Sequence, residues 1–412
     1  MPRVLLVLPT STYRASDFLE AAAEAGVEVA VAAEAPLPLI PEDRFVLIDC
    51  SRPEHAAEEI ADFLARTPVD AIVPVDDAGV VVAALAADRM GMAHNPPEAV
   101  AATRNKVQMR RLLDRSEVPQ PTFRLLGQSD DPSEVAEQVG YPLVVKPLGL
   151  SGSRGVIKVT SPSDLEQTVE RVRLINITSG SSPSEPLLME AFMPGPEVAV
   201  EGLVWNGRLE VLAVFDKPEA LDGPYFEETI MVAPSTLHPE MLEEVERVAG
   251  LAVSAIGIAN GPVHAELRIT DGRVGVLEVA ARSIGGLCGR TLRFGLSGDS
   301  LESLIIEQAL GKPQDGRRLL GSTGVLMIPI PAGGRLAGVD GIGEVSALPH
   351  VTGVEITVPV GSRIRPVPEA DRYLGFVFAR APDPKTVTDT LLAAKRMLVV
   401  LIEPPTTSAP SA

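Results

Sequence analysis

The sequence predicts a mixed α/β fold that begins with a doubly wound parallel sheet and continues with antiparallel strands. Short, continuous apolar runs such as 4–8 and 71–75 alternate with stretches of helical periodicity near the start of the chain. This alternation is typical of parallel strands that helices cover on both faces. Farther along, the pairs Asn206-Gly207 and Asp271-Gly272 each separate two strand-like runs, which is the pattern of antiparallel hairpins.

The length, charge and cysteine content indicate the number of domains, the partners and the cellular compartment to expect. A chain of 412 residues suits about two to four packed units. Its formal charge of −19 argues against nucleic acid and anionic membranes as partners. The two cysteines, Cys50 and Cys288, form no CxxC pattern and suit a reducing compartment. The first apolar run stops at Pro9, too early for a signal peptide, and no run approaches membrane-spanning length. We therefore expect a cytoplasmic protein.

The first part of the chain predicts a parallel sheet with a cleft at the carboxyl ends of its strands. We expect strands at 4–8, 27–32, 44–48 and 71–75 and helices at 16–25 and 54–65. Asp76 and Asp77 follow the last of these strands directly. Ligands of such sheets bind at the carboxyl ends, so both carboxylates are expected to face the cleft. The alternative, weighted equally, is that one of them caps the helix beginning near Ala78.

The remaining elements are more mixed. We expect helices at 103–113, 164–175, 239–256 and 385–399, and strands at 141–147, 156–159, 187–192, 197–205, 209–215, 261–269 and 274–280. The strands from 187 to 215 are expected to pair antiparallel through tight turns. No internal repeat is visible.

A loop of small residues follows the strand that ends in Lys146. It runs Gly149-Leu-Ser151-Gly152-Ser153-Arg154-Gly155 and leads into a second strand. Small residues let backbone N–H groups approach an anion, and the lysine adds fixed positive charge. The loop lies between two strands and lacks the P-loop and Rossmann patterns. Taken alone it predicts anion binding, with a flexible hairpin bearing a solvated lysine as an equal alternative.

Several segments in order resemble the ATP-grasp superfamily, and within it the L-amino acid ligase and carboxylate–amine ligase branch, over about residues 1–310. They are Thr103-Arg-Asn-Lys106-Val-Gln-Met, Val145-Lys146-Pro with its loop, Leu188-Met-Glu190-Ala191-Phe192-Met-Pro-Gly-Pro-Glu197, His264-Ala-Glu266, and Leu277-Glu278-Val-Ala-Ala-Arg282-Ser-Ile-Gly285-Gly286. The resemblance implies an ATP-grasp fold with an N-terminal parallel-sheet domain, a mobile lid and a C-terminal domain.

The expected domains follow from the resemblance and from breaks in the sequence. They are an N-terminal α/β domain at 1–98, a linker and start of the central domain at 99–140, a lid subdomain at 141–206, a catalytic subdomain at 207–314, a C-terminal domain at 315–403, and a disordered tail at 404–412.

The resemblance also implies an ATP site. Its expected residues are Lys106, Lys146, Ser151, Gly152, Ser153, Glu190, Ala191, Phe192 and Glu197. The Glu190 carboxylate or its neighbouring carbonyl would accept from the adenine amino group. Glu197 would accept from both ribose hydroxyls, since a carboxylate offers two acceptors to a vicinal diol. The alternative is that both glutamates lie on a sheet surface.

Glu266 and Glu278 are the expected metal ligands. They lie on the two strands of a predicted hairpin and are flanked by apolar residues. Carboxylates on an inward strand face need a cation, and Mg²⁺, with Mn²⁺ as a substitute, takes such hard oxygen ligands. Solvent exposure on a polar strand face is the alternative. The family usually has Asn two residues after the second Glu, but this chain has Ala280, which removes one ligand and puts the second metal in doubt.

The segment after Glu278 is expected to meet the reacting carboxylate. Arg282 would neutralise developing charge, as would Lys146 on the nucleotide side, while the N–H groups of Gly285 and Gly286 would hold the carboxylate. His264 shares the Glu266 face of its strand and would orient the amine or act as a base, unless it is structural. Other expected contacts are Lys217 to phosphate and Glu227 or Glu228 to an ammonium group; Cys288 is expected to be a small buried residue.

These assignments predict an ATP-dependent C–N ligase that forms an amide or peptide bond through an acyl phosphate. Its substrates would be a small-molecule carboxylate and an amine, with an amino acid among them, and homodimerisation is expected by analogy. One alternative is a bicarbonate- or formate-using ligase of purine or biotin metabolism, although a biotin-carrier motif is absent. Another, motivated by Ala280, is a nucleotide-binding protein that has lost catalysis.

Overall fold

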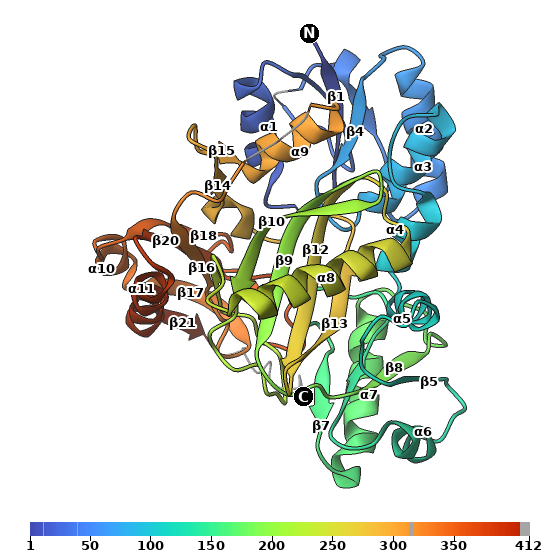
Figure 1. Ribbon diagram of the computed structural model, residues 1–412, viewed down its shortest axis with the longest axis vertical. Coiled ribbons are helices and arrows are strands. Elements are labelled where there is room, and N and C mark those ends of the chain that lie inside the picture. Colours follow the sequence, from blue (N-terminus) through green and yellow to red (C-terminus); the bar gives the residue numbers. More distant parts are fainter. Residues whose placement is uncertain (11, 39, 313–316, 404–412) are drawn as a thin grey trace, which may run out of the picture.

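A computed structural model describes residues 1–10, 12–38, 40–312 and 317–403. Three units extend from a central sheet: an N-terminal unit, a small-sheet unit and a C-terminal unit (Figure 1). The expected disordered tail at 404–412 lies outside the described residues. Within the described ranges, no helix combines the length and the apolar character that crossing a bilayer requires.

The N-terminal unit is a parallel sheet in the order β3-β2-β1-β4. Its strands are β1 (Arg3–Leu8), β2 (Glu28–Ala33), β3 (Phe45–Leu47) and β4 (Ala71–Pro74), with helices α1 (Ala15–Glu24), α2 (Pro53–Leu64) and α3 (Val80–Met90) and the short 3-10 helix η1 (Glu42–Arg44). Alternate residues of β1 enter two different cores: Val4 and Leu6 one, Leu5 and Val7 the other. Both faces of this strand are therefore buried, which explains its unbroken apolar run and confirms the doubly wound sheet.

A small antiparallel sheet in the order β5-β8-β6-β7 forms the second unit. It consists of β5 (Phe123–Leu126), β6 (Leu143–Lys146), β7 (Ile157–Val159) and β8 (Leu187–Ala191), with helices α6 (Pro132–Val139) and α7 (Leu165–Thr178) and the 3-10 helix η2 (Pro162–Asp164). The expected pairing of the strands at 187–192 and 197–205 is wrong. The chain crosses to another sheet at Gly195, where an added Cβ would lie 2.1 Å from the Ile269 carbonyl oxygen.

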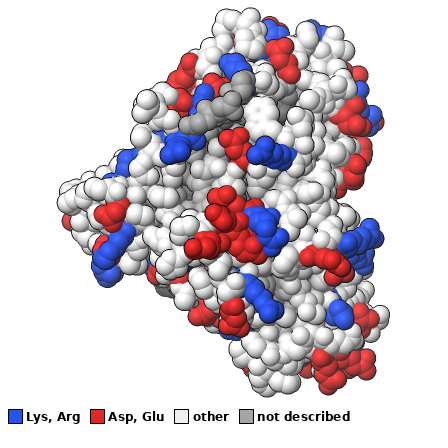
Figure 2. Space-filling model, viewed as in Figure 1, with Lys and Arg blue, Asp and Glu red and all other residues white. Residues whose placement is uncertain are grey.

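The central sheet is antiparallel and has the order β13-β12-β9-β10-β11-β16-β20-β18. Its strands are β9 (Glu197–Trp205), β10 (Arg208–Asp216), β11 (Ile230–Ala233), β12 (Gly261–Thr270), β13 (Arg273–Ala280), β16 (Ser322–Met327), β18 (Val351–Ile356) and β20 (Gly375–Ala381). Helix α8 (Pro239–Ile256) lies across β9, β10, β12 and β13 (Figure 1). Its buried side, including Val245 and Val248, packs on the sheet, while its exposed side carries acidic residues that gather at the middle of the face in Figure 2.

The other elements join and extend these units. They are α4 (Pro97–Thr103), α5 (Lys106–Arg115), the 3-10 helix η3 (Cys288–Thr291), β14 (Arg293–Phe294), β15 (Asp299–Ser300), α9 (Leu301–Ala309), β17 (Gly334–Asp340), α10 (Ile342–Ser346), β19 (Arg363–Ile364), α11 (Pro384–Met397) and β21 (Val399–Glu403). Strands β19, β17 and β21 form a separate small sheet.

Two boundaries differ from the sequence-based expectation. The helix expected at 103–113 is two helices, because the Asn105 side chain accepts from the N–H groups of Val107 and Gln108 and so begins α5. The small sheet spans 123–191, so it starts and ends earlier than the lid range of 141–206. Strands β16, β18 and β20 of the expected C-terminal domain complete the central sheet rather than forming one of their own.

Candidate active site

A cavity of about 660 Å³ lies where the units meet. The residues expected to bind nucleotide, metal or substrate line it, apart from Lys217: Lys106, Lys146, Ser151, Gly152, Ser153, Glu190, Ala191, Phe192, Glu197, Glu227, Glu228, His264, Glu266, Glu278, Arg282, Gly285 and Gly286. They come from α5, from the small sheet and its β6–β7 loop, and from the central sheet and the loops next to β11 and β13, which are far apart in sequence. The fold therefore brings the predicted residues to one place, while the role of each stays a prediction.

Lys146 and Glu190 form a buried ion cluster with Arg110 of α5. Glu190 accepts from Arg110 Nε at 2.6 Å and lies 2.5 Å from Lys146 Nζ. Burial by itself would raise the pKa of Glu190, but Arg110 and Lys146 outweigh it and lower that pKa to about 2. Burial, together with Arg110 and Lys106, lowers the pKa of Lys146 despite the contact with Glu190.

This cluster changes the expected role of Glu190. Both of its carboxylate oxygens are bound by cations, so the carboxylate is committed to positioning Lys146 and Arg110. Two acceptors were expected for the adenine amino group: the Glu190 carboxylate and a neighbouring main-chain carbonyl. Only the main-chain carbonyl, at the end of β8, takes no part in these ion pairs. Arg110 was not predicted, although its spacing of four residues from Lys106 places both on one face of α5.

The Gly/Ser loop connects β6 and β7 and is tied to α5. Lys106 Nζ donates to the Leu150 carbonyl at 2.7 Å and lies 3.3 Å from Glu278 Oε1. Gly152 and Ser153 both have left-handed backbones, with φ of 64° and 56°. An added Cβ on Gly152 would meet nothing within 4 Å, so its main chain is open to a ligand. The loop thus has the geometry that anion binding requires.

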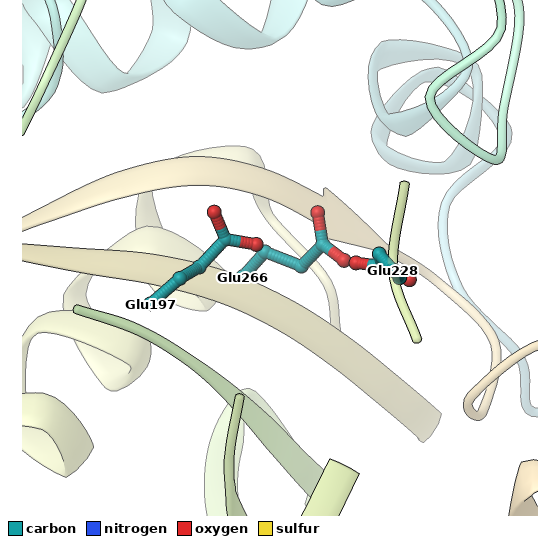
Figure 3. A group of neighbouring side chains, drawn as sticks. All are labelled: Glu197, Glu228 and Glu266. Atoms are coloured by element: carbon teal, nitrogen blue, oxygen red, sulfur yellow. The ribbon is translucent and has the colours of Figure 1, made fainter. Parts of the chain in front are cut away.

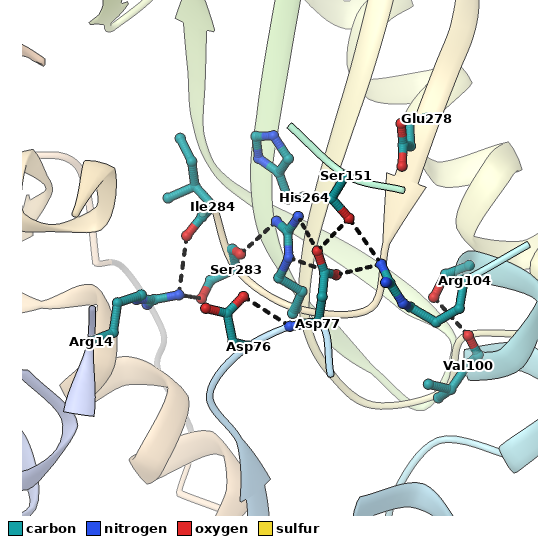
Figure 4. A network of polar contacts seen from close by, with 12 residues as sticks. Arg14, Asp76, Asp77, Val100, Arg104, Ser151, His264, Glu278, Ser283 and Ile284 are labelled. Carbon is teal, nitrogen blue, oxygen red and sulfur yellow. Dashed lines mark hydrogen bonds and ion pairs between the residues drawn. The ribbon is translucent and has the colours of Figure 1, made fainter. Parts of the chain in front are cut away.

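Asp77 joins the N-terminal unit to the rest of the cavity (Figure 4). It accepts from Arg282 Nε and Nη2 at 3.0 and 3.1 Å and from Ser151 Oγ at 2.8 Å, and Arg104 Nη1 lies 3.0 Å away. Burial would raise the pKa of Asp77, but Arg282 and Arg104 hold it well below its ordinary value. Helix α3 begins at Val80 without a side-chain cap, so Asp77 faces the cleft and the capping alternative is wrong.

Arg14 anchors the loop that follows Arg282. Its buried guanidinium donates to Ser283 Oγ at 2.7 Å and to the Ile284 carbonyl at 3.0 Å, and it pairs with Glu302 at 2.7 Å. Arg14 thus connects the N-terminal unit to the residues that come directly before Gly285 and Gly286. Arg14 was missed because no local pattern marks a single arginine whose partners lie about 270 residues away.

His264 lies between two glutamates. Its Nδ1 is 3.1 Å from Glu201 Oε2, and its Nε2 is 3.7 Å from Glu266 Oε1, as expected from their shared strand face. Burial lowers the pKa of His264, but the contacts with Glu201 and Glu266 outweigh it and raise the pKa to about 9. The ring is therefore protonated at neutral pH, which favours orienting a negative group over acting as a base.

Glu266 and Glu278 are direct cross-strand partners in β12 and β13, as predicted. However, the carboxylates that come within 4.8 Å of one another are Glu197, Glu228 and Glu266, in a row along the cavity (Figure 3). Lys217 Nζ bonds all three, at 2.6 Å from Glu197 and 3.0 Å from Glu266. Lys217 thus supplies the positive charge at this point.

The remaining assignments are placed as follows. Glu197 is buried and binds Arg268 Nη2 at 2.6 Å in addition to Lys217, so a ribose would share its oxygens with two cations. Cys288 is buried at the cavity wall, and burial raises the pKa of its thiol, which agrees with an unreactive residue. Ala280 also lines the cavity, opposite His264.

Comparisons with known proteins agree with this geometry. Residues 139–291 match the ATP-grasp domain, and residues 326–403 match the L-amino acid ligase C-terminal domain 2. The chain thus contains a segment that matches the ATP-grasp domain and a later segment that matches a C-terminal domain of L-amino acid ligases, so its similarity is to the L-amino acid ligase branch of ATP-grasp proteins.

Individual relatives are more distant. Alanine–anticapsin ligase of Bacillus subtilis is 25% identical over 249 residues, covering 56% of this chain and 52% of the relative. The chain thus spans about half the length of the curated relatives it matches. The crystal structure of L-amino acid ligase from Bacillus licheniformis has a TM-score of 0.81 at 24% identity and covers 98% of this chain and 99% of that chain. N5-carboxyaminoimidazole ribonucleotide synthetase from Thermotoga maritima has a TM-score of 0.71 at 17% identity, covering 98% and 100%.

Proposed function

We propose that the protein is an ATP-dependent carboxylate–amine ligase that forms an amide or peptide bond and uses an amino acid as a substrate. The observation that carries this proposal is the shared cavity: two lysines beside a Gly/Ser loop, paired strand glutamates and Arg282 all line one space. The match to the L-amino acid ligase C-terminal domain supports the amino acid substrate.

ATP is the proposed nucleotide. Lys106 and Lys146 neutralise its phosphates, and the N–H groups of residues 151–153 bind them. The end of β8, at Ala191 and Phe192, meets the adenine ring, and Glu197 meets the ribose. A neighbour of the same fold, carboxyaminoimidazole ribonucleotide synthase from Aspergillus clavatus, was solved as a complex with ATP.

The residues fit a divalent cation at Glu266 and Glu278. Within 4.0 Å, Glu266 has Lys217 and the His264 ring, and Glu278 has Lys106. The two glutamates are cross-strand neighbours at the cavity wall. Hard carboxylate oxygens suit Mg²⁺, with Mn²⁺ as a substitute. When bound, the ion would neutralise phosphate charge. The cluster of Glu197, Glu228 and Glu266 fits less well, because Lys217 Nζ already bonds all three.

The proposed reaction has two steps. A carboxylate oxygen attacks the γ-phosphorus of ATP, the bond to the β,γ-bridging oxygen breaks, and ADP leaves from an acyl phosphate. An amine then attacks the acyl carbon, phosphate leaves, and the amine loses a proton to solvent. Lys146 and Arg282 neutralise the charge that develops in the first step, while Gly285 and Gly286 hold the carboxylate. Closure of the loop at residues 149–155 would exclude water.

Two rival functions remain open to the same test. A bicarbonate- or formate-using ligase keeps the fold, as the carboxyaminoimidazole ribonucleotide synthetase neighbours illustrate, but the matched C-terminal domain favours an amino acid ligase. A protein without turnover is suggested by Ala280 alone. Homodimerisation and a cytoplasmic location stay predictions.

An ADP-release screen over pairs of amino acids, with bicarbonate and formate included, tests the proposal. We expect ADP release that depends on both a carboxylate and an amine and is abolished in Lys146→Ala and Glu278→Ala. Release that responds to bicarbonate or formate and not to amino acids would favour the first rival. Nucleotide binding without release across the whole screen would favour the second.

A further inference from the structure

Glu201 of β9 is a buried carboxylate that lies outside the cavity lining. It is 0% exposed, and it shares its strand face with Ala199 and Leu203, which belong to the core between the central sheet and the N-terminal unit. Among the described residues, the His264 ring holds the only Lys, Arg or His nitrogen within 4.0 Å of it. A carboxylate in such apolar surroundings is costly unless its oxygens are bound. The groups that bind Glu201 therefore account for its presence there.

Glu201 contacts two cavity residues that come from different segments. Both of its carboxylate oxygens accept from the Ile284 N–H, at 3.1 and 3.0 Å. Its Oε2 also lies 3.1 Å from Nδ1 of His264, which is its cross-strand partner on β12. His264 and Ile284 line the cavity, whereas Glu201 does not. An effect of Glu201 on a ligand in the cavity is therefore transmitted through these two residues.

The Ile284 main chain is bound on two sides by buried side chains. Its N–H donates to Glu201, and its carbonyl accepts from Arg14 Nη1 at 3.0 Å, a contact drawn in Figure 4. Arg14 is 1% exposed and also donates to Ser283 Oγ at 2.7 Å. Both polar groups of the Ile284 main chain are thus satisfied by side chains from other segments. The loop after β13 is therefore fixed at this residue between β9 and the N-terminal unit.

The two glycines that follow depend on this anchor. Gly285 and Gly286, which are proposed to hold the carboxylate, both line the cavity. An added Cβ on Gly285 would meet nothing within 4 Å, so its main chain is open to a ligand. Glycine has no side chain that could hold the loop in place, so the direction of its N–H group is set by the neighbouring residues. On the N-terminal side, the neighbouring residue is Ile284.

The same carboxylate also holds the His264 ring. Nδ1 of the ring lies by Glu201, and its Nε2 lies 3.7 Å from Glu266 Oε1. A contact at one ring nitrogen fixes the orientation of the imidazole and hence the direction of the other nitrogen. Glu201 thus orients two groups that face the cavity, one on a strand and one in a loop.

We propose that Glu201 is a positioning residue for the activation of the carboxylate substrate. Through Ile284 it directs the N–H groups of Gly285 and Gly286 into the cavity, and through His264 it directs a second polar group into the same space. This inference rests on the proposed ligase function and adds a residue that the proposed contacts with nucleotide, metal and substrate do not include. ATP binding should not depend on Glu201, because its described side-chain contacts reach neither α5 nor the Gly/Ser loop.

Steady-state kinetics of ADP release separate this role from a structural one. With the amino acid pair that gives the fastest release in wild type, Glu201→Ala should lower kcat/KM for the amino acids by about 100-fold. Its KM for ATP should stay within about twofold of wild type. Glu201→Gln keeps an oxygen for the Ile284 N–H but loses the charge beside His264, so its kcat/KM should fall by about tenfold. The matched control is Gln308→Leu, which removes a buried hydrogen bond to the Val204 carbonyl of the same strand and should leave both constants unchanged.

Amide hydrogen exchange measures the anchoring of the loop without any substrate. Exchange of the peptide that contains Ile284, followed by mass spectrometry, should be about tenfold or more faster in Glu201→Ala and unchanged in Gln308→Leu. A wild-type kcat/KM in Glu201→Gln, or equal rises in KM for ATP and for the amino acids in Glu201→Ala, would overturn the inference. Faster exchange in Glu201→Ala together with no ADP release by wild type would instead contradict the ligase function. Because Gln matches Glu in shape, Glu201→Gln keeps the kinetic test in force if Glu201→Ala does not fold.

Discussion

Arg171 on α7 and Glu369 in the loop before β20 are joined by two hydrogen bonds of 2.8 and 3.1 Å. Beside them, the Gly155 N–H donates to the Pro368 carbonyl at 2.8 Å. The small-sheet unit, which carries the Gly/Ser loop, is therefore held against the segment that also contributes Tyr373 to the cavity wall. This contact connects the Gly/Ser loop side of the cavity to the side formed by the segment before β20.

Loss of the contact between Arg171 and Glu369 should weaken nucleotide binding more than it lowers the free energy of unfolding. Arg171 is 40% exposed, so Arg171→Met should cost less than about 1 kcal/mol of unfolding free energy. We expect the dissociation constant for an ATP analogue, measured by calorimetry, to rise about 3–10-fold because the closed unit is held less firmly. Arg173→Met is the matched control, since Arg173 bonds Gly127 within its own unit. Equal changes in both variants would contradict a role for the contact.

The Glu190 cluster should make the unfolding free energy depend on acid pH. The pKa of Glu190 is lowered to about 2 in the folded protein. The ionised carboxylate therefore contributes fully to the free energy of unfolding above its pKa in the unfolded chain, about 4.5, and this contribution is lost as pH falls toward 2. From roughly pH 5 to pH 2, wild type should lose about 3 kcal/mol more than Glu190→Gln, as measured by denaturant titration. Glu244→Gln, at a surface pair with Arg247, should show little difference. Parallel curves for wild type and Glu190→Gln would contradict the prediction.

Ala280 should be a site where activity can be gained. It lies two residues beyond Glu278 on β13 and lines the cavity, so an Asn there would project on the same strand face. Ala280→Asn adds a carbonyl ligand, and the Mg²⁺ concentration for half-maximal ADP release should fall by about 3–10-fold. Ala280→Leu adds similar bulk without an oxygen and should not lower it. The idea fails if both variants respond alike.

Asp77 should position Arg282 for the reaction. Asp77→Asn removes the negative charge that Arg282 and Arg104 share, and we expect kcat to fall by about tenfold or more with a loss of about 1–3 kcal/mol in unfolding free energy. The matched variant is Asp76→Asn, whose side chain accepts only from the Asp77 N–H among the described contacts. A kcat for Asp77→Asn equal to that of Asp76→Asn would show that Asp77 is only structural.

The sequence by itself determined the parts of this protein that depend on local pattern. The apolar run of β1, the two hairpin turns and the ordered ATP-grasp motifs can each be recognised within a few residues, and every one of these motifs contributes residues to the cavity lining. Their chemistry is local too: a lysine at a strand end or two glutamates on paired strands can be recognised without knowing the rest of the fold.

Only the tertiary structure decided which acidic side chain pairs with which basic side chain. Glu190 is committed to Arg110 and Lys146, Lys217 joins three glutamates, and Asp77 holds Arg282. It also decided that Met231 and Met327 share one wall of the cavity. Such partners come from segments far apart in the chain, and ion pairs and packing depend on distances of a few ångströms. Sequence pattern does not carry that information, because many side chains of suitable charge were available and only the fold selects among them.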